Sequence, residues 1–119
     1  MPVHVVLDSN DPEALAPFWC ELLGVKVRSV FEDGRHVILA PTNEGFVIGF
    51  QRVPEPKVCK NRMHVDVMVE DLDEATAKAE SLGGRWGEPG ITRELEGFLW
   101  RCLFDPEGNE FCIYTRLTT

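Results

Sequence analysis

The sequence predicts an α+β fold made of two tandem βαβββ modules that are related by a pseudo-two-fold axis. An internal repeat predicts this fold, and so does the same order of strand and helix patterns in both halves. Identical residues recur sixty positions apart: His4 and His64, Val5 and Val65, Asp11 and Asp71, Leu22 and Leu82, Gly24 and Gly84. Because the order and the lag are constant, we interpret the halves as copies of one unit.

The repeat sets the expected organisation of the chain. Its 119 residues suit one domain, residues 1–119. Within it we expect module one at about 1–53, a linker at 54–62 and module two at about 63–119. The linker carries two prolines and the basic residues Lys57, Lys60 and Arg62.

Each module begins with a predicted strand, Val3–Leu7 in module one and Met63–Val69 in module two. Every second residue of these segments is apolar, as in a strand that buries one face. The opposite faces carry His4, Val6 and Asp8 in the first strand, and His64, Asp66 and Met68 in the second.

A helix is predicted after the first strand of module two. Asp71 is a suitable cap, an apolar stripe runs from Leu72 to Leu82, and Gly83-Gly84 ends the helix. In module one, Asp11 is the cap, but Pro17 interrupts the pattern, because proline clashes with the carbonyl four residues earlier. We therefore expect only an opening turn at 12–15 and the main helix from about Pro17 to Leu23.

Three extended segments follow each predicted helix. Turn residues separate them, and the strongest hairpin signal is the stretch from Asp105 to Asn109. The segments are Val25–Phe31, His36–Ala40 and Phe46–Val53 in module one, and Arg85–Trp86 with its continuation, Phe98–Phe104 and Glu110–Arg116 in module two.

Charge and composition exclude several classes of protein. The formal net charge of −8 argues against binding to nucleic acid or to anionic lipid. No apolar run reaches the roughly 20 residues of a membrane span, and no basic segment precedes an apolar one at the N-terminus. The four cysteines form no CxxC motif, so we expect reduced thiols and a cytoplasmic protein.

The chain resembles the vicinal oxygen chelate superfamily, which holds glyoxalase I, bleomycin-resistance proteins and extradiol dioxygenases. Within it, the chain is similar to the small glyoxalase-like domains. The stretches that carry the resemblance are DPEALAPFWCELLG, FQRVPEPKVCKNRMHVDVMVEDLDEA and DPEGNEFCIY. The resemblance implies that each module curls its sheet around a shared cup. It also implies a homodimer, which would cover exposed sheet edges.

The resemblance further implies a divalent metal held by the first and last strands of each module. His4 and His64 match the first-strand ligands, whereas Cys112 stands where the family usually has a glutamate. Module one offers no matching last-strand ligand, but Glu110 supplies a carboxylate near Cys112. The candidate metal set is therefore His4, His64 and Glu110, for Zn, Mn, Ni or Fe, with less than one tightly bound ion per chain expected.

The candidate catalytic pair is His64 and Asp66, two residues apart on one strand face. It acts either in acid–base chemistry or as a hydrogen-bonded pair that lines the cup. Cys112 is either a ligand contact or a small buried residue, and Trp100 either stacks on a planar ligand or fills core. The predicted ligand-binding residues are His4, Asp8, Met68, Gln51, Arg52, Trp100 and Cys112.

Three functions fit these residues. The first is a metal-dependent lyase, isomerase or dioxygenase-like enzyme for a small oxygenated substrate. The second is a metal-free protein that binds a small molecule, and the third is a structural or partner-binding domain with a vestigial cup. The incomplete metal set favours the second, and the retained histidine pair argues against the third.

Overall fold

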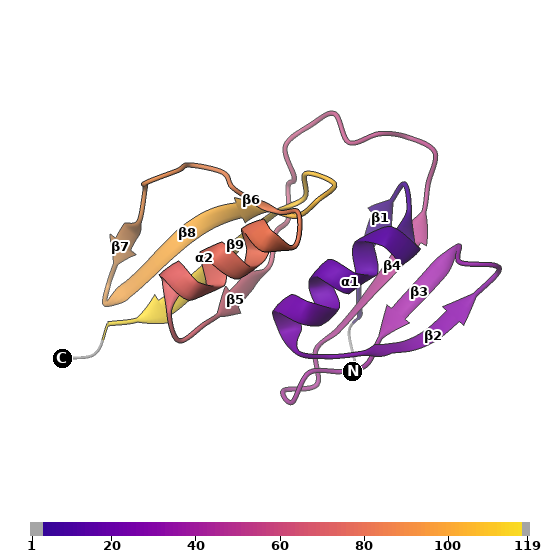
Figure 1. Ribbon diagram of the computed structural model, residues 1–119, viewed down its shortest axis with the longest axis horizontal. Coiled ribbons are helices and arrows are strands. Elements are labelled where there is room, and N and C mark those ends of the chain that lie inside the picture. The colour runs from indigo at the N-terminus through magenta and orange to yellow at the C-terminus, as the bar shows by residue number, and fades with distance from the viewer. Residues whose placement is uncertain (1–3, 118–119) are drawn as a thin grey trace. The chain divides into compact units, whose positions relative to one another are not determined.

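The computed structural model describes residues 4–117, so Val3 of the first predicted strand lies outside the described part. The chain divides after Pro56 into two compact units, which are described separately. The α+β class is confirmed: each unit pairs one helix with one mixed sheet (Figure 1).

The first unit contains one helix and a four-stranded sheet. The elements are β1 (His4–Ser9), α1 (Pro12–Leu23), β2 (Val27–Phe31), β3 (His36–Leu39) and β4 (Val47–Arg52). Spatial order in the sheet is β1-β4-β3-β2. The first and last strands run parallel, and the other pairs are antiparallel.

The second unit repeats this arrangement. The elements are β5 (Asp66–Met68), α2 (Leu72–Ser81), β6 (Arg85–Trp86), β7 (Arg93–Leu95), β8 (Phe98–Phe104) and β9 (Glu110–Arg116). The order is β5-β9-β8-β6, with β5 and β9 parallel. Both β6 and β7 pair with β8, at opposite ends of it, and so share one position in the sheet.

The helix caps agree with the sequence. The side chain of Asp11 accepts a hydrogen bond from the N–H of Ala14 at 3.2 Å, and that of Asp71 accepts one from the N–H of Glu74 at 3.0 Å. Gly24 ends α1 with a φ of 69°, a left-handed conformation that glycine adopts without a steric penalty.

The predicted break at Pro17 is wrong, because α1 runs continuously from Pro12 to Leu23. Pro17 lies on the exposed side of the helix, where the carbonyl it leaves unpaired is open to water. Leu15, Phe18 and Trp19 are each at most 2% exposed. Burying these residues on both sides of Pro17 offsets the lost hydrogen bond.

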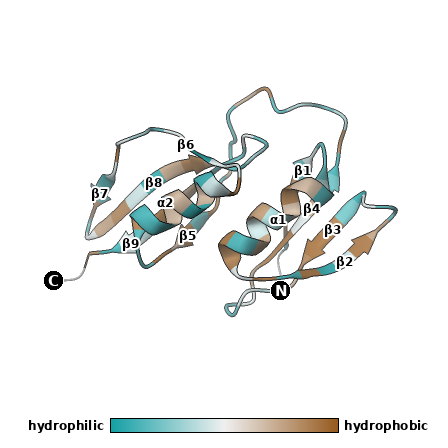
Figure 2. Ribbon diagram, viewed as in Figure 1, coloured by the Kyte–Doolittle hydropathy of each residue, from teal (hydrophilic) through white to brown (hydrophobic). Residues whose placement is uncertain are grey.

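The core of each unit lies between its helix and one face of its sheet. Phe111 and Ile113 in β9 and Leu103 in β8 are fully buried, whereas the residues between them face the other side. Hydrophobic residues of β3 and β8 are brown in Figure 2. In the second unit the face away from α2 is thus left free for polar side chains.

The first strand of the second unit is shorter than predicted. Its ladder covers Asp66–Met68, and flanking backbone bonds join Val65 and Val69 to β9. β9 itself begins at Glu110, so the residues around Met63 have no strand beside them. The predicted alternation nevertheless holds, since Val65, Val67 and Val69 are half-buried between exposed neighbours.

Candidate functional site

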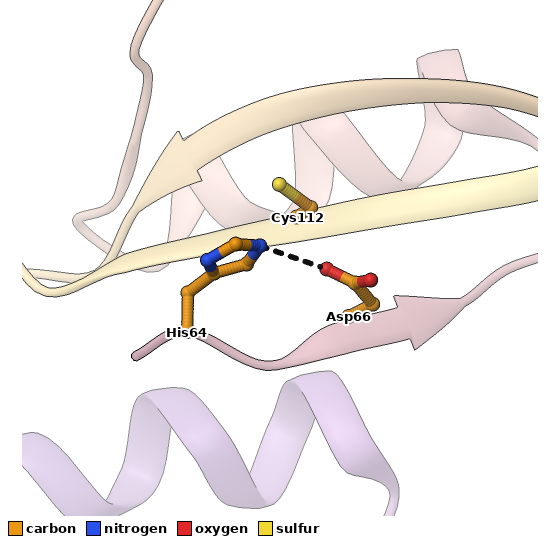
Figure 3. A group of neighbouring side chains, drawn as sticks. All are labelled: His64, Asp66 and Cys112. Carbon is orange, nitrogen blue, oxygen red and sulfur yellow. Dashed lines mark ion pairs between the residues drawn. The ribbon is translucent and has the colours of Figure 1, made fainter. Parts of the chain in front are cut away.

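Three side chains of the second unit converge on the open face of its sheet. His64 Nε2 lies 3.3 Å from Asp66 Oδ1, and the Sγ of Cys112 lies beside them (Figure 3). One ligand atom from each residue falls within 4.8 Å of the others. In residues 4–117 this is the one group of three or more such side chains that could hold a metal ion.

Strand register brings these residues together. Asp66 of β5 pairs with Cys112 of β9, so both side chains point to the same face of the parallel pair. His64 precedes Asp66 by two positions and therefore shares that face. The side chains of His64 and Asp66 are 43% and 59% exposed, which leaves both open to a ligand.

A pocket of about 480 Å³ opens over this group. Its remaining wall is apolar and largely aromatic: Leu95, Phe98, Trp100 and Tyr114. Phe98 and Tyr114 meet edge to face, with ring centroids 6.0 Å apart. Aromatic walls beside a few polar groups are typical of sites for small molecules.

The thiol of Cys112 is held in its protonated form. Burial, contact with Cys102 and the negative charges of Asp66 and Glu110 raise the pKa of Cys112 to about 12. At neutral pH, beside reduced Cys102, it is therefore mostly a neutral, weakly polar group. The pair of His64 and Asp66 is then the part of the site that can exchange a proton with a ligand.

The structure brings four of the predicted site residues into one pocket: His64, Asp66, Trp100 and Cys112. Met68 is 64% exposed and does not line that pocket. Glu110 forms an ion pair with Lys60 and is not part of the group formed by His64, Asp66 and Cys112.

The other predicted residues belong to the first unit. His4 and Asp8 are exposed on β1. Gln51 lines a pocket of about 430 Å³ on the sheet of that unit. Arg52 donates to the carbonyl of Asp33 at 3.4 Å and lines a further pocket of about 390 Å³ with Arg35.

Sequence reasoning missed part of the pocket wall. Tyr114 follows Cys112 by two residues in β9, and Phe98 precedes Trp100 by two residues in β8. Strand alternation applied to these two segments finds both residues. Leu95 lies on β7, which was not predicted as a separate strand, so no pattern in the chain marked this residue as part of the pocket.

Comparison with known proteins identifies the family. A family model described as Glyoxalase-like domain matches residues 4–114. The chain therefore belongs to the glyoxalase-like domain family, and the resemblance to the vicinal oxygen chelate superfamily is confirmed. No curated protein matches the chain.

Solved structures with the same fold have low sequence identity to the chain. A glyoxalase/bleomycin resistance protein/dioxygenase family enzyme from Burkholderia phytofirmans PsJN has a TM-score of 0.77 at 19% identity, over 96% of this chain and 97% of that one. A fosfomycin resistance protein from Listeria monocytogenes has a TM-score of 0.75 at 14% identity, over 100% and 93%. A glyoxalase/bleomycin resistance protein/dioxygenase from Alicyclobacillus acidocaldarius has a TM-score of 0.69 at 16% identity, over 99% and 92%. These likenesses establish the fold.

In residues 4–117, neither helix has the length and apolar character needed to cross a bilayer.

Proposed function

We propose that the chain binds a small molecule in the pocket of the second unit. The observation that carries this proposal is the combination, in one pocket, of aromatic walls and the group formed by His64, Asp66 and Cys112. A ligand with a flat apolar part and one polar end matches both features. The rings of Trp100 and Tyr114 pack on the flat part, and His64 hydrogen-bonds the polar end.

Within this site, His64 is the proton-exchanging residue and Asp66 orients it. The carboxylate of Asp66 lies 3.3 Å from the imidazole of His64, close enough to hold the ring in place. His64 then donates to an oxygen of the ligand, or takes a proton from a neighbouring carbon or hydroxyl.

A metal-assisted lyase, isomerase or dioxygenase-like enzyme is the second candidate. Its support is the donor set of one imidazole, one carboxylate and one thiol within 4.8 Å. Such a mixture of nitrogen, oxygen and sulfur suits Zn²⁺ best, and Ni²⁺ or Fe²⁺ less well. When bound, the ion would polarise oxygen atoms of a substrate. The ion would be held by His64, Asp66 and Cys112. This set replaces the one predicted from the sequence, which was His4, His64 and Glu110.

The proposal extends to assembly and location. We expect a homodimer in the cytoplasm, because exposed sheet edges favour pairing with a second copy and the cysteines are free. Light scattering should give twice the mass of 13.4 kDa. A mass of one chain at tens of micromolar protein would contradict the dimer.

The test of the binding proposal is a thermal-shift screen of oxygenated metabolites and antibiotics on metal-free protein. The best hit should stabilise the parent and a Glu80→Gln control on the exposed side of α2, but not His64→Ala or Trp100→Ala. If the hit stabilises His64→Ala as much as the parent, the pocket is not the site. Elemental analysis of untagged protein then tests the second candidate, since about one ion per chain favours the enzyme.

A further inference from the structure

Two cysteines face each other across the hairpin of β8 and β9. Cys102 and Cys112 are directly paired in the strand register, and their Sγ atoms are 3.6 Å apart. Cys112 lines the proposed pocket, whereas Cys102 lies beside it on the same face of the sheet. Both thiols are free in the structure.

Backbone hydrogen bonding identifies the kind of pair they form. The N–H of Cys112 donates to Val65 on one side, and the carbonyl of Cys102 accepts from Gly87 on the other. These groups point away from the shared ladder, so the two cysteines occupy a non-hydrogen-bonded position. There the Cα atoms approach to about 4.5 Å, within the range of about 4.4–6.8 Å that a disulfide spans.

We propose that Cys102 and Cys112 form a reversible disulfide when the chain meets a peroxide, and that the bond removes the Cys112 thiol from the pocket. Neither the family nor the proposed binding function requires this modification. Among the described residues, these are the only two cysteines with sulfur atoms in contact.

The chemistry balances with hydrogen peroxide as the oxidant. Cys102 reacts first, because it is partly exposed while Cys112 is 7% exposed. Its thiolate attacks one peroxide oxygen and the O–O bond breaks, which gives a sulfenic acid and hydroxide. The hydroxide takes up the proton that the Cys102 thiol released, and water forms. The sulfur of Cys112 then attacks that sulfenic sulfur, the S–O bond breaks, and a second water leaves with the Cys112 proton. The thiols lose two electrons, the peroxide gains them, and a dithiol reductant reverses the bond.

The expected effect on the site rests on the proposed function. Cys112 belongs to the group that includes His64 and Asp66. A disulfide sulfur carries no proton and cannot become a thiolate, so oxidation removes one metal donor and one weak hydrogen-bond donor from the pocket. We expect Zn²⁺ to bind the oxidised chain at least about tenfold more weakly than the reduced chain.

Peptide mapping tests the disulfide itself. Exposed Cys59 is replaced by serine to prevent links between chains, and the protein is treated with peroxide, alkylated under denaturing conditions and digested with trypsin. The peptide from Cys102 to Arg116 contains both cysteines. It should be lighter by two hydrogen atoms and unalkylated, and dithiothreitol should restore alkylation of both thiols.

Matched variants make the result specific. Cys102→Ser and Cys102→Ala should each leave Cys112 open to alkylation after peroxide, while Cys20→Ser should change nothing. The inference is overturned if both thiols of the parent peptide stay alkylatable. It is also overturned if the link joins Cys102 or Cys112 to Cys20.

Zn²⁺ titration of reduced and oxidised protein separates this inference from the proposed function. A disulfide in a chain that binds no Zn²⁺ when reduced supports the redox pair and counts against the metal candidate. Equal Zn²⁺ affinity before and after oxidation overturns the claim that the bond acts on the site. Zn²⁺ binding that peroxide weakens and dithiothreitol restores supports both.

Discussion

The two sheets have the same strand order but differ in the residues at matching positions. In each unit the residue two positions after the histidine pairs with a residue of the last strand, and that residue pairs with one of the neighbouring antiparallel strand. The matching rows are Val6, Gly49 and Ile38 in the first unit, and Asp66, Cys112 and Cys102 in the second. One row is apolar, and the other carries a carboxylate and two thiols.

This difference shows that the fold fixes positions but not chemistry. His4 and His64 each stand two residues before their row, yet only His64 has an acidic neighbour on its strand face. Val6 has no polar group to hold the imidazole of His4, whereas Asp66 lies 3.3 Å from that of His64. In the described residues, the group of potential metal donors accordingly lies in the second unit alone.

The largest expected effect concerns the turns that set the two hairpins. Asp105 is 3% exposed and accepts bonds from Glu107 N at 2.9 Å, Asn109 N at 2.8 Å and Asn109 Nδ2 at 2.9 Å. Thr42 accepts one, from Phe46 N at 3.1 Å. Asp105→Ala should lower the free energy of unfolding by about 3 kcal/mol, and Thr42→Ala should lower it by about 1 kcal/mol or less. Urea denaturation measures both changes. Equal losses of stability in the two variants would show that the two turns stabilise their sheets to the same extent.

Histidine substitutions test whether the site belongs to one unit. His64→Ala should weaken binding of the best small-molecule hit about 10- to 100-fold, because it leaves a polar group of the ligand without its hydrogen bond, at a cost of about 1–3 kcal/mol. His4→Ala is the matched variant at the equivalent position. A small effect of His4→Ala by calorimetry would restrict the site to the second unit, whereas equal losses would favour the predicted cup shared by both modules.

The reactivity of Cys112 tests the environment created by its row neighbours, Asp66 and Cys102. Its raised pKa of about 12 lowers the thiolate fraction at neutral pH, and the greater nucleophilicity of a basic thiolate offsets only part of that loss. Iodoacetamide should therefore modify Cys112 about thirtyfold more slowly than an unperturbed thiol. Because the group is an acid with a raised pKa, its rate should keep rising from about pH 9 to about pH 12. Mass spectrometry of the reduced protein, with exposed Cys59 as the internal reference, measures this. Equal rates at neutral pH would contradict the assigned environment.

Introducing the side chains of the second unit's row at the matching positions of the first unit should have the smallest effect. A Cβ at Gly49 would lie 3.5 Å from the Val37 carbonyl and 3.7 Å from Ile38 Cγ1, so a side chain fits there. The double variant Val6→Asp, Gly49→Cys should add a weak Zn²⁺ equivalent beside His4, seen by competition with a chromophoric chelator, while Val6→Asp alone should not. If the parent binds Zn²⁺ but the double variant binds no additional Zn²⁺, these two side chains alone do not explain why the two units differ in metal binding.

Much of the fold could be predicted from the sequence, because its signals are local. Alternation places the strands, Asp11 and Asp71 cap the helices, and the turn from Asp105 to Asn109 marks the last hairpin. Two features depend on context instead. Pro17 is tolerated because its helix face meets solvent, and β7 joins β8 through a tight turn at Glu96-Gly97 with φ values of 49° and 86°. Glutamate rarely adopts a positive φ, so the sequence does not predict that turn.

The site was predictable only in part. Alternation alone places His64 and Asp66 on one face, but their contact with Cys112 depends on the parallel register of β5 and β9. That register joins residues 46 positions apart, and no local pattern specifies it. The contact between Cys102 and Cys112 follows from the hairpin register, which the turn at Asp105 determines.

The parallel pairing of β5 with β9 also has a kinetic consequence. Helix α2 and the hairpin of β8 and β9 are built from nearby residues and form early, whereas β5 must close a long loop before it pairs. β5 is a three-residue edge strand, so local opening releases it more readily than the seven-residue central strand β9. Its detachment carries Asp66 and the adjoining His64 away from Cys112 while the hairpin stays paired. Amide hydrogens of β5 should therefore exchange faster than those of β9. The pocket should be lost and re-formed at the rate of this local opening, which is faster than global unfolding.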